Sequence, residues 1–354
     1  MDDKIFSLWF HNLKIKNEIK INALKSGITP ELFYKMDTKD YLKYNLNIIE
    51  SEMIKQSKDL SIYKEIISYL KLEKINIVLF CDDEYPEILK NINSPPVGFF
   101  IKGKMPNLNN SLAIVGARKA SDYGKTAAYK LSYDTALRGI VIISGMARGI
   151  DTSAHRGALD SNGKTIAVMG SGFKNIYPSE NKKLMYEISE NGCVITEYFP
   201  DIKPYSSNFP ERNRLISGLS KYTMVVEAGE RSGSLITAEF ALEQGKDVFA
   251  VPGNIFSPNS IGTNRLIKDG AKIILSSQDI LEEFKLENIN HNNIIFDEME
   301  SKIIDSLKGN GSTIENLSEM LNIDAADLLS MLSKLECKGI IKRAYGNYYI
   351  KCIT

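Results

Sequence analysis

Between residues 111 and 287, short apolar runs alternate regularly with segments of helical character, and this alternation limits the fold more than any other feature of the sequence. The runs are rich in Val and Ile and apolar on both faces, which is the pattern of buried parallel strands. Seven such strands are expected, at residues 111–116, 140–145, 165–170, 193–198, 222–228, 247–252 and 271–275. Strands separated by helices indicate an α/β fold with a doubly wound, mostly parallel sheet and right-handed crossovers.

The regions on either side of this alternation differ from it. Residues 1–75 carry apolar residues at helical spacing and predict a helical N-terminal domain, followed by a central domain at residues 76–287. The clearest apolar stripe of the N-terminal region consists of Tyr63, Ile66, Ile67, Leu70 and Leu72. Residues 295–354 predict three short helices and then a hairpin that turns at Tyr345-Gly346-Asn347, an order typical of a winged-helix domain.

The cysteines and the N-terminus indicate where the protein works. The chain has four cysteines and no Cys-x-x-Cys spacing, which argues against a disulfide framework or a zinc site and fits a reducing cytosol. The N-terminus is acidic, and no long apolar stretch follows it. We therefore expect a cytoplasmic protein without a signal peptide, a membrane span or a bound metal.

The basic residues are distributed unevenly, although the formal net charge is zero. Nine of the 44 basic residues are arginine, and eight of those nine lie within residues 111–275. Arginine matches phosphate geometry and stacks on flat rings better than lysine does, so the central domain is the expected phosphate-binding region. The alternative is that these arginines form internal salt bridges. In the third C-terminal helix, acidic residues offset Lys334 and Lys338, so a protein-contact or regulatory role is as well supported there as DNA reading.

Five of the expected strands run into loops that contain glycine and polar or basic residues. Glycine lets backbone amides approach a ligand, and the helix start beyond each loop presents free N–H groups and a partial positive charge. Five such loops at one edge of a sheet suggest a groove that follows several phosphates. The candidate residues of this groove are Gly116, Arg118, Ser144, Gly145, Arg148, Gly170, Gly172, Phe173, Lys174, Tyr177, Asn181, Lys182, Arg212, Asn213, Arg214, Ser232, Gly233 and Ser234.

Four aromatic residues lie among these loops: Phe173, Tyr177, Tyr198 and Phe209. Stacking of an aromatic side chain on a single-stranded base contributes roughly 1–3 kcal/mol and tolerates any sequence. We expect Tyr198 and Phe209 to pack in the core beneath the loops. Phe173 and Tyr177 are therefore the candidates for stacking.

Few residues of the sequence have a catalytic pattern. Asp151 and His155 are four residues apart at the start of a helix, and the favoured interpretation is a capping aspartate that the histidine orients. Gly116-Ala117-Arg118 lacks the second glycine of a dinucleotide-binding loop, and Gly124-Lys125-Thr126 lacks the earlier glycine of a P-loop. We therefore expect no cofactor and no enzymatic activity.

Several segments resemble the DprA/Smf family of DNA-processing proteins in order and spacing. They are residues 113–118 (AIVGAR), 144–155 (SGMARGIDTSAH), 209–218 (FPERNRLISG), 232–238 (SGSLITA) and 249–253 (FAVPG). The resemblance is strong over about residues 75–285 and looser in the terminal regions. It implies an extended Rossmann-like central domain and a homodimer formed through it. It also implies single-stranded DNA held in a basic groove, protected, and delivered to the RecA recombinase in natural transformation.

The resemblance also suggests roles for individual residues. Arg118 and Arg148 look like phosphate contacts, and Arg212, Asn213 and Arg214 look like a second stretch of the groove or its scaffold. One position departs from the family: after Tyr177-Pro178, where many relatives have a basic residue, this chain has Ser179. Lys174 and Lys182 are the candidates to replace that charge.

Two other functions stay open. Residues 227–239 are similar to the loops of nucleoside-monophosphate phosphoribohydrolases, in which case Glu227 or Glu239 would assist N-glycosidic cleavage while Arg118 held the phosphate of the nucleotide. The third candidate is a protein-binding adaptor whose main surface is the winged helix.

Overall fold

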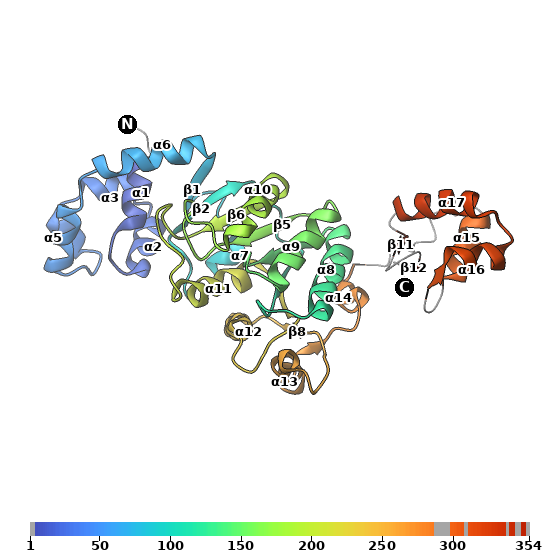
Figure 1. Cartoon of the computed structure of the whole chain (residues 1–354). Coiled ribbons are helices and arrows are strands. Elements are labelled where there is room, and N and C mark those ends of the chain that lie inside the picture. The colour runs from blue at the N-terminus through green and yellow to red at the C-terminus, as the bar shows by residue number, and fades with distance from the viewer. Residues whose placement is uncertain (1–3, 287–297, 308–310, 338–339, 344–347, 352–354) are drawn as a thin grey trace. The chain divides into compact units, whose positions relative to one another are not determined.

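The computed structural model describes residues 4–286, 298–307, 311–337, 340–343 and 348–351 (Figure 1). These residues form two compact units, residues 1–287 and 288–354. The second unit begins near the expected boundary at residue 295. The expected division of the first unit at residue 75 stays a prediction, because the N-terminal helices and the sheet cluster together.

A nine-stranded sheet forms the centre of the first unit, in the order β1-β2-β6-β5-β4-β3-β7-β8-β9. The strands from β3 to β9 pair in parallel, whereas β1 and β2 add an antiparallel edge. Their bounds are β1 Ile75–Leu79, β2 Gly98–Gly103, β3 Ser111–Val115, β4 Val141–Ser144, β5 Thr165–Val168, β6 Cys193–Thr196, β7 Tyr222–Val225, β8 Val248–Ala250 and β9 Lys272–Ile273. All seven expected strands are present, and the doubly wound, mostly parallel sheet is confirmed.

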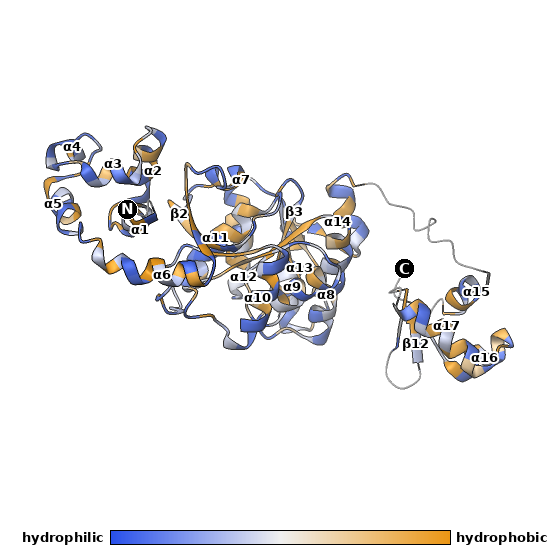
Figure 2. Ribbon diagram, turned by 90° about the horizontal axis from the view of Figure 1, so that it is seen from above, coloured by the Kyte–Doolittle hydropathy of each residue, from blue (hydrophilic) through white to orange (hydrophobic). Residues whose placement is uncertain are grey.

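Helices cover both faces of this sheet (Figure 2). Successive residues of a strand pack into different cores. In β3, for example, Leu112 and Ile114 join the core beneath α8 (Asp122–Leu137) and α9 (Ile150–Asp160), while Ala113 and Val115 join the core beneath α11 (Asn208–Leu219) and α12 (Gly233–Glu243). This two-sided burial explains why the strands are apolar throughout. The remaining helices after β5 are α10 (Lys182–Asn191), α13 (Ile261–Lys268) and α14 (Ser277–Glu283).

The N-terminal region is helical, as expected, and packs on the antiparallel edge through α1 and α6 against β1. Its helices are α1 Lys4–Asn12, α2 Asn17–Lys25, α3 Pro30–Lys35, α4 Thr38–Leu42, α5 Ile48–Gln56 and α6 Lys64–Leu72, and the short α7 Glu87–Lys90 follows β1. Trp9 and Phe10 of α1 are fully buried against Phe33 of α3. Of the expected apolar stripe, Tyr63 and Leu70 are buried but Leu72 is exposed.

The second unit has the expected order of three helices followed by two antiparallel strands. They are α15 Glu298–Ser306, α16 Ile314–Leu321, α17 Ala325–Cys337, β11 Ile341–Arg343 and β12 Tyr348–Lys351. A short strand that the sequence did not predict, β10 (Ser312–Thr313), pairs with β12. Apolar residues from all these helices form a separate core. The expected turn at residues 345–347 lies outside the described residues, and the winged-helix assignment stays a prediction.

Candidate nucleic-acid interface

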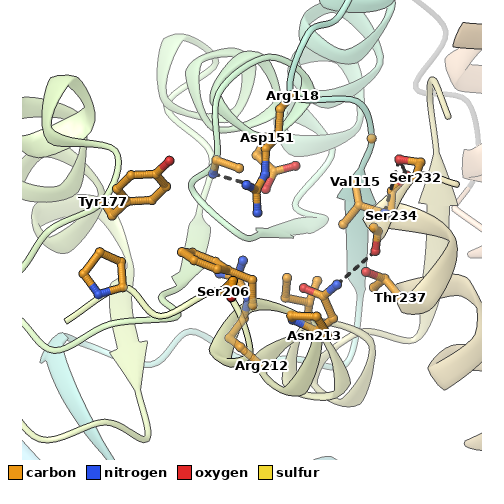
Figure 3. Close-up of a pocket in the computed structure, with 17 residues that line it drawn as sticks. Val115, Arg118, Asp151, Tyr177, Ser206, Arg212, Asn213, Ser232, Ser234 and Thr237 are labelled. Carbon is orange, nitrogen blue, oxygen red and sulfur yellow. Dashed lines mark hydrogen bonds between the residues drawn. The ribbon is translucent and has the colours of Figure 1, made fainter. Parts of the chain in front are cut away.

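A cavity of about 540 Å³ opens at the carboxyl edge of the parallel strands, and we call it the strand-edge cavity (Figure 3). Its walls come from the segments that follow β3, β4, β5, β6 and β7. β3 lies between β4 and β7, so the order of strands reverses at this point. Open α/β sheets bind ligands at such a reversal. The geometry therefore brings together several of the loops that the sequence identified.

Arg118 is the cation that is most available in this cavity. It is exposed, and its guanidinium carbon lies 5.0 Å from the centre of the Phe209 ring. Among the residues that the structure describes, no carboxylate forms an ion pair with it. Figure 3 shows Arg118 reaching over the cavity, opposite Arg212 and Asn213 of α11. A free arginine held against an aromatic face can receive a phosphate without first breaking an internal salt bridge.

Two aromatic rings line the cavity, and one of them was not expected there. Tyr177 is 40 % exposed, and its ring centre lies 5.5 Å from that of Phe209. The expectation that Phe209 lies in the core is wrong, because the first turn of α11 places it over Gly170 at the cavity wall. The expectation that Phe173 is free to stack is also wrong, since it is 4 % exposed and belongs to the main core. Tyr198 is partly buried, and its hydroxyl bonds the carbonyl of Asn208.

Arg212 and Asp151 form the polar floor of the cavity. Arg212 is buried and donates from Nη1 to the carbonyl oxygens of Gly145, at 2.8 Å, and Val168. Burial lowers its pKa to about 10. The Asp151 carboxylate accepts from the amides of Gly145 (3.1 Å) and Ala147 (3.2 Å), so it occupies the amides that were expected to hold a phosphate in the loop after β4. Burial raises the pKa of Asp151, although Arg212 opposes that shift.

His155 does not orient Asp151, contrary to the expectation from their spacing. Its Nδ1 lies 2.7 Å from the hydroxyl of Thr165, and that hydroxyl donates to the carbonyl of Ile142. Nδ1 must therefore carry the proton, and Nε2 is left without a hydrogen-bond partner. Burial lowers the pKa of His155 to about 3, so the ring is neutral. It ties α9 to β5 and has no part in the cavity.

The other expected basic contacts differ in their availability. Arg214 is buried, pairs with both oxygens of Glu197 at 2.6 and 2.9 Å, and donates from Nε to the carbonyl of Ser94. It acts as scaffold, which is one of the two roles predicted for it. Arg148 and Lys174 are exposed but paired, Arg148 with Glu180 and Lys174 with Asp201.

Most of the expected glycines have a structural reason to be glycine. A Cβ on Gly116 would lie 2.6 Å from the Ile150 side chain, and one on Gly172 would lie 2.0 Å from the carbonyl oxygen of Phe199. A Cβ on Gly145 would lie 2.7 Å from the Arg212 side chain, and one on Gly170 would lie 2.9 Å from the Phe209 ring. These glycines therefore permit close packing of the loops, and their presence alone is no sign of a phosphate.

Three polar candidates also differ in exposure. Ser144 is buried and donates to the carbonyl of Ile114. Asn181 is buried and donates to the carbonyl of Met146 and the hydroxyl of Thr152. The expectation that Ser144 and Asn181 contact DNA is therefore wrong, while Lys182 is exposed.

The N-terminus of α12 forms the wall opposite Tyr177 (Figure 3). The hydroxyls of Ser232 and Ser234 are 2.8 Å apart, and Ser232 caps the helix by accepting from the amide of Ser234. Asn213 donates to the carbonyl of Gly233, which ties α12 to α11. Gly233 has open space where a Cβ would lie. The first turn of α12 thus faces the cavity with the partial positive charge of a helix N-terminus.

The two glutamates of the hydrolase hypothesis lie away from the cavity. Glu227 is 2 % exposed and accepts from the amide and the hydroxyl of Ser121, at the start of α8. Glu239 is exposed on α12 but does not line the cavity. Neither carboxylate is therefore placed to act on a ligand that Arg118 holds in the cavity.

The family model of the DNA recombination-mediator protein A matches residues 76–285, which include the whole strand-edge cavity. The chain belongs to the DprA family. It is 41% identical to the DNA processing protein DprA of Bacillus subtilis over 247 residues, covering 69% of this chain and 81% of that protein. The DprA/Smf resemblance of the loops is thus confirmed.

Solved DprA structures agree with this fold. The X-ray structure of DprA from Streptococcus pneumoniae superposes with a TM-score of 0.67 at 35% identity, covering 79% of this chain and 98% of that one. A DprA structure from Helicobacter pylori, described by its single-stranded DNA binding mode, gives a TM-score of 0.55 at 29% identity, covering 60% of this chain and 96% of that one.

The sequence predicted neither a metal site nor a membrane-spanning helix. Within the described ranges, no group of three or more His, Cys, Asp or Glu side chains is arranged to hold a metal ion. No helix in the same part of the chain is both long and apolar enough to cross a membrane.

Proposed function

We propose that the protein binds single-stranded DNA in the strand-edge cavity. The observation that carries this proposal is Arg118, an exposed arginine held over the Phe209 ring in an open cavity. Arg118 and the N-terminus of α12 would contact phosphates from two different walls of the cavity. Tyr177 and Phe209, between them, would stack on bases without reading the sequence. The similar DprA structure from Helicobacter pylori, described by its single-stranded DNA binding mode, supports single-stranded DNA as the ligand.

Membership in the family supports a proposal for the wider role of the protein. We infer that the bound strand is protected and handed to the RecA recombinase in the cytoplasm, during recombination of incoming DNA in natural transformation. We also infer a homodimer formed through the central domain, which would place two cavities in one assembly. The protein acts in this scheme as a binding protein and not as an enzyme.

The first test is a titration of the protein into fluorescent oligo-dT and into a duplex of equal length, with anisotropy read at several salt concentrations. We expect preference for the single strand and a log affinity that falls by about 0.7 per phosphate contact for each unit of log salt. Arg118→Ala should bind at least about 10-fold more weakly, because a charge-assisted hydrogen bond is lost, and should show a shallower salt slope.

The matched control is Lys35→Ala, which removes one positive charge from an exposed ion pair on α3, outside the cavity. It should bind like the wild type. If the protein binds neither DNA at low salt, the proposal is wrong. If Arg118→Ala and Lys35→Ala lose equal amounts of DNA affinity, only the net charge of the protein matters.

The hydrolase alternative has a direct assay. Incubation with nucleoside monophosphates should release no free base, because Glu227 is held by Ser121 and Glu239 lies outside the cavity. Release of free base that Glu239→Gln abolishes would favour the enzyme. Failure to bind any DNA, together with no hydrolysis, would favour the adaptor.

A further inference from the structure

The turn at residues 254–257, which follows β8, carries two strongly exposed apolar side chains. Phe256 is 88 % exposed and Ile255 is 76 % exposed. The two side chains are adjacent in the chain and together form an exposed apolar patch, and such patches often mark the binding site of a ligand or partner. The turn is therefore a candidate binding element.

This turn is held rigidly by the residues on either side of it. Asn264 of α13 accepts from the amide of Gly253 at 3.1 Å and donates to its carbonyl at 3.0 Å. Within the turn, the side chain of Asn254 accepts from the amide of Phe256 at 2.8 Å. A Cβ on Gly253 would lie 2.1 Å from the Ser260 hydroxyl, so the two ends of the loop touch. An exposed ring on such a turn loses little conformational entropy when it binds.

The same turn adjoins the loops that build the strand-edge cavity. The side chain of Asn259 donates to the carbonyl of Lys119, the residue after Arg118, at 3.1 Å. Its carbonyl accepts from the amide of Ala228, in the loop that leads to the N-terminus of α12. Asn259, two residues after the turn, thus ties this loop both to the segment that carries Arg118 and to the segment that leads to α12.

The surface between the cavity and the turn has the chemistry of a single-strand path. Tyr123 is 54 % exposed, and its hydroxyl donates to the carbonyl of Pro252 at 2.8 Å. Lys119 in the loop after β3 and Arg231 in the loop after β7 are exposed, and Glu230, next to Arg231 in the chain, is exposed too. Because the local charge is nearly balanced, stacking rather than phosphate attraction would supply most of the affinity here.

We propose that Phe256 is a second DNA contact, which stacks on a base of the strand after it leaves the strand-edge cavity. The proposal rests on the proposed function, because it extends the same bound strand. The hydrogen bonds that join this loop to the cavity loops favour DNA as the occupant over a second protein surface.

The experiment compares the wild type with Phe256→Ala on oligo-dT of increasing length, from about 6 to about 20 nucleotides. Both proteins should bind the shortest oligomer equally, since it is held in the cavity alone. With longer oligomers the wild type should gain affinity, and Phe256→Ala should be weaker by about 5-fold or more because one stacked base is lost. Arg118→Ala, in contrast, should weaken binding at every length.

A spectroscopic readout makes the contact visible. The chain has one tryptophan, Trp9, and it is fully buried. In Phe256→Trp, saturating long oligo-dT should quench the added emission, as expected for an indole stacked on a base. In Leu72→Trp, at a position that is 79 % exposed on α6, the emission should not change.

The possible outcomes separate this inference from the proposed function. If the wild type binds DNA but Phe256→Ala binds every length equally well and Phe256→Trp is not quenched, the second contact is wrong and the cavity stands. If the wild type binds no DNA, both fail. If Phe256→Ala changes the molar mass of the protein in solution and leaves DNA affinity intact, the turn is a contact between protein chains, which overturns the proposal.

Discussion

The arginine side chains of the central domain differ in their exposure and in whether a carboxylate pairs with them. Arg118 is exposed and unpaired among the described residues, Arg148 is exposed and paired, and Arg212 and Arg214 are buried. The buried pair of Arg214 with Glu197 joins α11 to the end of β6 and to Ser94. This difference supports the proposal that Arg118 binds the DNA, and it gives Arg214 a place in the scaffold.

This division predicts that the two paired arginines contribute very differently to stability. Arg214→Ala should reduce the free energy of unfolding by about 3–5 kcal/mol, because it leaves Glu197 buried and unpaired. Arg148→Ala breaks a pair between two exposed side chains, and it should leave the urea midpoint of unfolding nearly unchanged. Urea unfolding of both variants would measure the difference. A similar small loss in both would mean that Arg214 is not a structural anchor.

Individual elements are joined by polar contacts as well as by the apolar cores. His155 of α9 donates to Thr165 of β5, and Thr165 in turn donates to Ile142 of β4. One helix and two neighbouring strands thus share a chain of hydrogen bonds beneath the cavity. The chain requires a neutral imidazole, because the ring is buried beside Arg212 and Arg156.

The neutral imidazole makes stability depend on pH. The pKa of His155 is about 3 in the folded protein and near its ordinary 6.5 when unfolded. The contribution of the neutral His155 ring to the free energy of unfolding is therefore present in full above pH 6.5, and it is lost as the pH falls toward 3. Between pH 7 and 4.5, the free energy of unfolding of the wild type should fall by about 2–3 kcal/mol more than that of His155→Asn. The amide of the introduced asparagine can still donate to Thr165. Urea unfolding across this range is the measurement. If the free energies of unfolding of the wild type and His155→Asn change with pH in the same way, His155 is not held neutral.

The whole molecule consists of two units with separate cores. Every residue of the strand-edge cavity and of the turn at residues 254–257 belongs to the first unit. The second unit has its own apolar core, built from α15, α16, α17 and the small sheet. DNA binding and the role of the second unit should therefore be separable.

Truncation after residue 287 tests this separation. The shortened chain should fold with a single cooperative transition and bind oligo-dT within about 2-fold of the full protein, because it keeps both cores that enclose the sheet. Circular dichroism and anisotropy would be compared for the two chains. A 10-fold or greater loss of affinity in a folded truncation would mean that the second unit contacts DNA.

The sequence alone determined the parallel sheet, the positions of its strands, the loops at its carboxyl edge and the family. These features depend on local order: buried strands need continuous apolar runs, and tight loops need glycine where a Cβ would clash, as at Gly116 and Gly172. It also identified Arg118 and Tyr177 among the residues that line the cavity.

Only the tertiary structure decided which candidates are free to bind. Phe173 and Phe209 look alike in sequence, but one points into the core and the other lines the cavity. Arg118 and Arg214 also look alike, but Glu197 neutralises only Arg214, across 17 residues of chain. Exposure and ion pairing depend on which loops the sheet brings together, and residues distant in the chain supply those neighbours.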